Sequence, residues 1–400
     1  MNVLQISPQV PFPLDDGGKV SIFNITKSLA ERGHRITMLA FDFGQDHNYD
    51  TLRKYCDLHT IPHSRENSFF GVLANAFSSL PYNISKYQSR KFARTLTELV
   101  DSKTFDVLHV DYLHMAGYGL LAKSRIGIPV VLREHDVQST IMERYATTVS
   151  NPLLRLFLNT QVRKIRAYES KMLGSVDCCC AITEVDANRI RDLQPSANVT
   201  TIPAGVDSSM FDTTHSEGQI PESIVFFGGM NWIPNQDAVH WFVESILPRV
   251  IIGHPKVKFF ILGKDPPPSI KNLESESIIV KGFVPDLHNE LQKYRVAIAP
   301  FRIGGGLRIK IIECFALKIP VVSTSIGCEG IAAVNGKSIM IEDDVDKFAR
   351  SIISLFEDDT LRTLLTKEAF NLVTSQYRWE SVAEKFEQVY VDVIDRYGNR

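Results

Sequence analysis

The sequence has little of what marks metal-binding, secreted, membrane-spanning or nucleic-acid-binding proteins. Its six cysteines form no C-x-x-C pair and three are contiguous, so we expect buried thiols in a reducing compartment and no zinc site. No apolar stretch of about 18 residues occurs, and the first residues lack the pattern of a signal peptide. The formal net charge of −2 offers no general attraction to nucleic acid. These absences predict a cytoplasmic protein without a nucleic-acid partner.

No Asp-x-Asp pair suited to a metal ion is present either. The paired acids at residues 15–16 and 343–344 lie in turn-like contexts. We therefore expect neither a metal nor a cofactor.

The chain instead contains two series of short apolar runs that alternate with helical segments. Its 400 residues exceed the size at which one core usually stops growing, which favours two domains. Residues 203–222, rich in Pro, Gly, Ser, Thr and Asp, separate the two series. Such alternation predicts an α/β fold with parallel sheets. The strand candidates are residues 3–6, 36–40, 107–110, 129–132 and 178–182, then 224–227, 257–262, 278–280, 296–300, 321–323 and 338–341.

Three consecutive glycines stand between a strand candidate and a helix in the second half. Backbone without a Cβ can approach a ligand closely there, and a helix start suits a phosphate. Arg308 and Lys310 add two cations, and Glu313 could accept hydrogen bonds from sugar hydroxyls. The pattern fits a diphosphate with an attached ribose, or simply a turn before a solvated basic helix. The glycines are Gly304, Gly305 and Gly306.

Polar residues also follow strand candidates of the first half, where ligands of open parallel sheets bind. Gly17 and Gly18 could bring backbone near a ligand or form an ordinary turn. Asp111 could contact an acceptor hydroxyl. In the segment 134–136, Asp136 could hold the tautomer of His135 or cap the next helix. The remaining members of these clusters are Glu134, His109 and His114.

The order and spacing of several motifs resemble the retaining glycosyltransferases of family 4. That family has the GT-B fold of two facing Rossmann-like domains. The motifs are the Gln-Ile-Ser-Pro opening with Gly-Gly over 5–18, Pro-Ala-Gly-Val-Asp at 203–207, Gly-Gly-Met-Asn-Trp at 228–232, the Arg-x-Gly-Gly-Gly run at 302–313 and Pro-Val-Val-Ser-Thr at 320–324. The last three of these are similar to motifs of a bacterial subgroup that assembles surface polysaccharide.

With the linker, this resemblance implies a domain division. We expect an acceptor-binding domain at 1–205, a linker at 206–222 and a nucleotide-sugar-binding domain at 223–378. The helix at 379–400 is expected to pack back on the first domain.

The resemblance also implies roles for single residues. It places His135 near the transferred sugar, and Gly17 and Gly18 near the donor diphosphate or that sugar. In the second domain it implies nucleotide contacts for three residues: Glu313 at the ribose, Phe283 near the base and Glu329 in a neighbouring loop.

Two departures from the family pattern concern the donor site. Gly305 stands where many members have a first glutamate, and residues 230–235 lack the usual Arg and Lys. We expect Arg308 and Lys310 to replace those cations, with Lys264 assisting. Without an obvious carboxylate nucleophile, same-face attack through an oxocarbenium-like state is favoured.

The expected reaction is metal-independent transfer of a hexosyl unit, with retention, from a nucleotide diphosphate sugar to a sugar, lipid-linked sugar or glycan. A nucleotide-sugar epimerase of the same fold and an inactive sugar- or nucleotide-binding scaffold are the alternatives. Basic helices at 86–94 and 155–171 and the apolar segment 69–77 fit peripheral contact with an anionic membrane at the inner face, or solvated helix faces.

Overall fold

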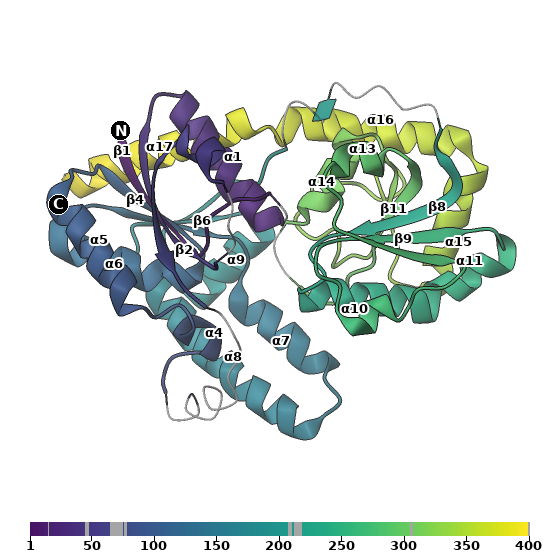
Figure 1. Cartoon of the computed structure of the whole chain (residues 1–400), viewed down its shortest axis with the longest axis horizontal. Coiled ribbons are helices and arrows are strands. Elements are labelled where there is room, and N and C mark those ends of the chain that lie inside the picture. The colour runs from purple at the N-terminus through teal and green to yellow at the C-terminus, as the bar shows by residue number, and fades with distance from the viewer. Residues whose placement is uncertain are drawn as a thin grey trace. The chain divides into compact units, whose positions relative to one another are not determined.

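The computed structural model describes residues 1–14, 16–44, 48–64, 75, 78–206, 210–211, 218–304 and 307–398. They form two compact units (Figure 1). Of the described residues, the first contains 1–14, 18–203 and 382–398, and the second contains 16–17 and 204–381.

The first unit is built on a seven-stranded parallel sheet with the order β3-β2-β1-β4-β5-β6-β7. The chain runs outward from β1 through β2 to β3 and then returns to the other side of β1 with β4. That reversal between β1 and β4 is a topological switch point, beyond whose carboxyl ends ligands bind in open α/β sheets. The strands are β1 (Asn2–Ser7), β2 (Arg35–Asp42), β3 (Asp57–Pro62), β4 (Val107–Asp111), β5 (Val130–Glu134), β6 (Cys178–Ala181) and β7 (Val199–Thr201).

Helices follow the strands of this unit, and α7 and α8 lie side by side as a hairpin (Figure 1). From Val382 onward the last helix, α17, also belongs to this unit. The helices are α1 (Gly17–Glu31), α2 (Asp50–Arg53), α4 (Tyr82–Ser85), α5 (Arg90–Ser102), η1 (Leu113–Met115), α6 (Ala116–Ile126), α7 (Gln138–Thr148), α8 (Pro152–Leu173), α9 (Glu184–Leu193) and α17 (Trp379–Gly398).

The second unit has a six-stranded parallel sheet with the order β10-β9-β8-β11-β12-β13. Its switch point lies between β8 and β11. The strands are β8 (Ile220–Phe227), β9 (Lys258–Leu262), β10 (Ile278–Gly282), β11 (Tyr294–Ala299), β12 (Val321–Ser323) and β13 (Met340–Ile341). The helices are α10 (Ile233–Trp241), η3 (Phe242–Ile246), α11 (Leu247–Gly253), α12 (Pro268–Lys271), α13 (Leu287–Leu291), α14 (Ile309–Ala316), α15 (Val345–Glu357) and α16 (Asp359–Gln376).

The central strands are buried along nearly their whole length, as in parallel sheets covered on both faces. Every strand expected from an apolar run is present, and the predicted α/β class is confirmed. The strands β3 and β7 were not predicted, because β3 carries His59 and Thr60 in its middle and β7 has only three residues.

Two segments differ from the expected pattern. Gly17 and Gly18 are the first residues of α1 rather than a loop before it. Strand β8 starts at Ile220, within the expected linker 206–222, of which residues 207–209 and 212–217 lie outside the described residues. No helix in the described ranges combines the length and apolar character that crossing a membrane requires.

Candidate functional site

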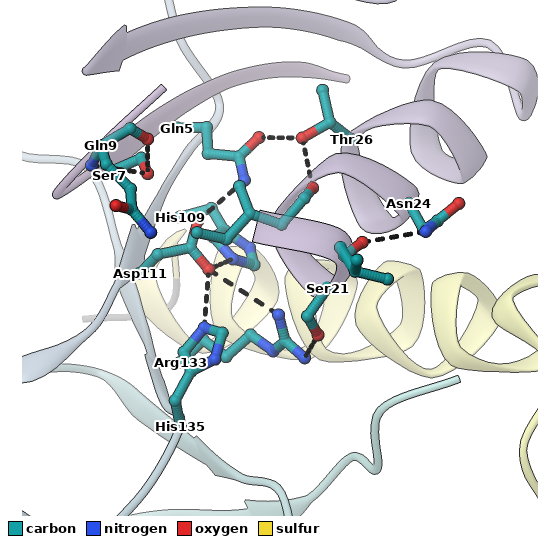
Figure 2. A network of polar contacts seen from close by, with 12 residues as sticks. Gln5, Ser7, Gln9, Ser21, Asn24, Thr26, His109, Asp111, Arg133 and His135 are labelled. Carbon is teal, nitrogen blue, oxygen red and sulfur yellow. Dashed lines mark hydrogen bonds and ion pairs between the residues drawn. The ribbon is translucent and has the colours of Figure 1, made fainter. Parts of the chain in front are cut away.

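Asp111 is the centre of a buried polar network in the first unit (Figure 2). It ends β4 at the switch point, and its side chain is fully buried. Gln5 Nε2 donates to Asp111 Oδ2 at 2.8 Å, and the Nε2 atoms of His109 and His135 each lie 3.4 Å from Oδ1. Burial opposes ionisation of this carboxyl, but its interactions with the two histidines prevail and hold its pKa below the ordinary value.

Arg133 brings a second buried charge to the same network. Its Nη1 lies 3.9 Å from Asp111 Oδ1, and its Nη2 donates to Ser21 Oγ at 2.7 Å (Figure 2). Burial lowers the pKa of Arg133, and the Asp111 carboxylate counteracts this. An arginine remains charged under such conditions, so Asp111 and Arg133 form a buried pair that polar neighbours help to satisfy.

His135 is held on two sides. Its ring stacks on Tyr112 with centroids 3.8 Å apart and planes 4° apart, while its Nε2 faces Asp111. Burial and then the nearby charge of Arg133 lower the pKa of His135 to about 4, so the ring is neutral at pH 7. A neutral imidazole that donates Nε2–H to a carboxylate presents Nδ1 as an acceptor. His135 can therefore receive a hydrogen bond from a hydroxyl group.

The C-terminal helix α17 packs against this network at His109. Tyr390 Oη lies 2.5 Å from His109 Nδ1, and the ring of Phe386 lies 5.2 Å from the imidazole. Between these two residues on the same helix, Glu387 pairs with Arg32 and contacts His34. Nothing in the local pattern of residues 379–400 pointed to Tyr390, because the contact joins segments that lie far apart in the sequence.

Glu134 and Glu169 form a buried acidic pair beside the network. Glu134 is 2% exposed, and neither of its carboxyl oxygens has a hydrogen-bond partner among the described residues. Burial, and then the charge of Glu169, raises the pKa of Glu134 well above its ordinary value. Burial also raises the pKa of Glu169 to about 7. Burial and the neighbouring charge therefore favour the protonated form of Glu134.

The expected role of Asp136 at the imidazole was wrong, since Asp111 contacts His135 and Asp136 accepts a hydrogen bond from Gln138 Nε2. Asp136 does not cap α7 either. Glu169, reaching over from α8, accepts the backbone N–H groups of Gln138 and Ser139 at the start of that helix. His114 also lies apart from Asp111, against the ring of Tyr87 at 4.8 Å.

Lys310 is the centre of the candidate site in the second unit. It extends from the first turn of α14 to the carboxyl ends of β8 and β11, where its Nζ lies 4.2 Å from the ring centroid of Phe226 and 4.8 Å from that of Phe301. The ammonium donates to Asn235 Oδ1 at 3.0 Å. Burial, and then the charge of Arg308, lowers the pKa of Lys310 to about 7.

Glycines make room for this lysine at the strand ends. A Cβ on Gly228, whose φ is +146°, would lie 2.8 Å from Lys310 Nζ and 2.9 Å from Asn235 Nδ2. One on Gly263 would lie 1.9 Å from the carbonyl oxygen of Gly228. Side chains at either position would displace backbone or the ammonium group.

Arg308 takes the N-cap position of α14 and is 4% exposed. Its guanidinium lies 5.0 Å from the ring of Phe301 and 6.0 Å from that of Trp232. A Cβ on Gly304, whose φ is +121°, would lie 2.6 Å from Arg308 Nη2. Gly304 thus has a steric reason to be glycine, while Gly305 and Gly306 lie outside the described residues.

Glu313 follows one turn later on α14 and is partly buried. Burial raises its pKa to about 7, against the opposing charge of Lys310.

Phe283 lies just after β10 and is 56% exposed, so it is a surface residue and not part of the core. Glu329 is partly buried in the turn after β12, and Lys264 lies two residues after β9.

Together these groups could neutralise a diphosphate and accept hydrogen bonds from hydroxyl groups. Groups of three or more metal-ligating side chains do not occur within the described ranges.

Two family models match the chain. Residues 16–209 match the model described as Glycosyltransferase Family 4, and residues 221–358 match the one described as Glycosyl transferases group 1.

Similar proteins come from several bacteria. A 44.6 kDa uncharacterised protein in the cps region of Klebsiella pneumoniae is 20% identical, over 94% of this chain and 96% of the relative. The phosphatidyl-myo-inositol mannosyltransferase of Mycolicibacterium smegmatis is 22% identical, over 98% of this chain and 94% of the relative. The crystal structure of Anabaena HepE in complex with UDP-glucose has a TM-score of 0.68 at 12% identity, covering 98% of this chain and 99% of the other.

Proposed function

Because the chain belongs to the family 4 glycosyltransferases, which have the GT-B fold, we propose that it transfers a hexosyl unit from a nucleotide diphosphate sugar to a hydroxyl acceptor. The observation that carries this proposal is the position of two buried or half-buried cations, Arg308 and Lys310, at the switch point of the second sheet. Ligands of open α/β sheets bind at such points.

The donor diphosphate would take its counter-charges from Arg308 and Lys310. Both cations are partly removed from water, which strengthens their attraction for a phosphate. Glu313, one turn along the same helix, would accept from the ribose hydroxyls, with Phe283 and Glu329 near the nucleotide. The similarity to a protein crystallised with UDP-glucose supports a nucleotide sugar as donor.

The first unit would bind the transferred sugar and the acceptor. Neutral His135 would accept a hydrogen bond from a sugar hydroxyl through Nδ1, while Asp111 and Tyr112 hold the ring in place. Because Asp111 is fully buried and contacts Gln5, His109 and His135, it acts by orienting His135 and does not contact the acceptor directly. Gly17 and Gly18 would add backbone N–H groups at the start of α1.

Bond breaking at the anomeric carbon places negative charge on the leaving nucleoside diphosphate. Fixed cations and the α14 N-terminus can stabilise that charge without a metal. Retention by same-face attack, with the departing phosphate as base, fits the glycine at position 305.

A role in cell-surface polysaccharide synthesis follows from the motif subgroup and is supported by a relative from a cps region. We place the protein in the cytoplasm, in peripheral contact with the inner face of an anionic membrane. Leu154 and Leu156 on α8 are 41% and 64% exposed and flank exposed Arg155. Flotation with anionic vesicles at low salt tests this contact, and protein that stays unbound would contradict it.

Thermal-shift measurements with UDP, GDP, TDP and ADP test the donor site, since a ligand that binds the folded state raises the melting temperature. We expect one nucleotide to stabilise the wild-type protein and to lose that effect in Lys310→Gln. If none of the four stabilises the wild type, the proposed function is wrong.

A further inference from the structure

Asn235 uses both ends of its side-chain amide. It lies in the first turn of α10 and is 4% exposed. Its Oδ1 accepts from Lys310 Nζ at 3.0 Å, and its Nδ2 donates to the carbonyl oxygen of Gly229 at 2.8 Å. Because the Nδ2 contact is to backbone, the amide cannot flip without losing a bond, and the oxygen is kept toward the lysine.

The lysine needs such a contact because its other neighbours attract it without fixing its direction. The ring faces of Phe226 and Phe301 favour a cation, yet a cation–π contact tolerates a range of positions. A four-carbon stem leaves the ammonium mobile unless a hydrogen bond holds it. An ammonium has three donors, so one bond to Asn235 leaves others for a ligand.

Resting on the proposed function, we propose that Asn235 is a positioning residue that holds the Lys310 ammonium where it binds a phosphate of the nucleoside diphosphate. The residue itself is neutral, so it orients the cation without cancelling its charge. Gly228 is part of this arrangement, because a Cβ at that position would occupy the space of the Lys310 ammonium and the Asn235 amide.

Charged and titratable groups around Lys310 determine the pH at which its ammonium group loses a proton. Arg308 disfavours the ammonium form, whereas Glu313 and the thiol of Cys314 favour it. The Asn235 oxygen adds a hydrogen bond to the charged form only. Removing it lowers the pKa of Lys310, so fewer molecules carry the cation above pH 7 and affinity for a diphosphate falls earlier as pH rises.

Calorimetric titration with the stabilising nucleoside diphosphate, between pH 6 and 9, tests the inference on the intact protein. Asn235→Ala should bind about tenfold more weakly at pH 7.5, the effect expected for one hydrogen bond to a charged group. The pH midpoint of binding, at which the affinity for the nucleotide has fallen halfway as the pH rises, should move to lower pH in this variant. In Lys310→Gln the contribution of the lysine to the pH dependence should be absent, while those of Glu313 and of the nucleotide itself remain.

Gln236 supplies the matched control. Its Nε2 donates to the carbonyl oxygen of Met230 at 2.8 Å, so it tethers the same loop without contacting the lysine. Gln236→Ala should keep the wild-type midpoint. Equal losses in Asn235→Ala and Gln236→Ala, with the midpoint unchanged, would reduce Asn235 to a loop tether and overturn the inference.

Asn235→Asp covers the case in which the alanine variant does not fold. It keeps an oxygen acceptor and adds a negative charge, so the midpoint should move to higher pH. An unmoved midpoint overturns the inference while the wild-type binding upholds the donor site. If wild-type protein binds none of the four nucleotides, both the inference and the proposed function are wrong.

Discussion

His135 and Tyr112 stack almost parallel, with ring centroids 3.8 Å apart, although one follows β5 and the other follows β4. The stack leaves the imidazole little freedom to turn. With Asp111 at Nε2, it fixes which ring nitrogen is open to a ligand.

We therefore predict that His135→Ala lowers the turnover number by roughly 10²-fold, in the range seen when one preorganised hydrogen-bonding group is lost. Initial rates with the donor identified by thermal shift measure this. His114→Ala is the control, since His114 lies against Tyr87 and apart from Asp111. With a pKa of about 4, His135 should add no inflection to the rate between pH 6 and 8. Equal rates for the two variants would contradict its role.

Arg308→Ala should raise the donor Michaelis constant at least tenfold, because the variant loses a buried cation that is proposed to bind the donor diphosphate. Arg302→Ala is a suitable comparison. Arg302 already forms a two-point ion pair with Asp237, at 3.1 and 2.5 Å, on the surface of the same unit. Steady-state kinetics on both variants check the prediction, which fails if they behave alike.

Glu134→Gln should become more stable than the wild type as the pH rises. The folded-state pKa of Glu134 is raised, so its contribution is fully present below the unfolded pKa and is lost as pH rises through the folded pKa. Glutamine keeps the shape and cannot ionise. Between pH 5 and 8 we expect the difference in the free energy of unfolding to shift in favour of the variant.

Urea unfolding at the two pH values measures that shift. Exposed Glu31→Gln serves as the control and should show no comparable trend. A difference between Glu134→Gln and wild type that is the same at pH 5 and pH 8 would show that Glu134 does not hold a proton in the folded state.

Phe386→Ala should destabilise the first unit by about 3–5 kcal/mol, the usual cost of emptying a buried aromatic position. Phe386 is fully buried and lies against His109 and the guanidinium of Arg133. Val391→Ala on the same helix, 41% exposed, should change stability by less than about 0.5 kcal/mol. Urea midpoints compare them, and a mild effect of Phe386→Ala would mean that α17 contributes little to this core.

Much of the fold could be read from local patterns. Buried parallel strands need continuous apolar runs, so β4, β5 and β11 were evident, whereas polar β3 and the short β7 gave no such signal. Glycine at 304 and cations at 308 and 310 also stand close together in the chain, and this spacing fits a phosphate site or a turn before a solvated basic helix.

Contacts between residues that lie far apart in the sequence could not be predicted from local patterns. Asp111 and His135 are 24 positions apart, Lys310 and Asn235 are 75 apart, and His109 and Tyr390 are 281 apart. Which residues meet depends on strand order and on how helices pack over the sheet, and neither is encoded in a local pattern.

The sequence by itself determined the α/β class, the family and the glycine-lined basic turn, because each depends on residues near one another in the chain. Only the tertiary structure decided that Asp111 rather than Asp136 faces His135 and that Asn235 holds Lys310. It alone also decided that the pKa of Glu134 is raised, because burial and neighbouring charge set the pKa of a side chain, and both arise only when distant segments pack together.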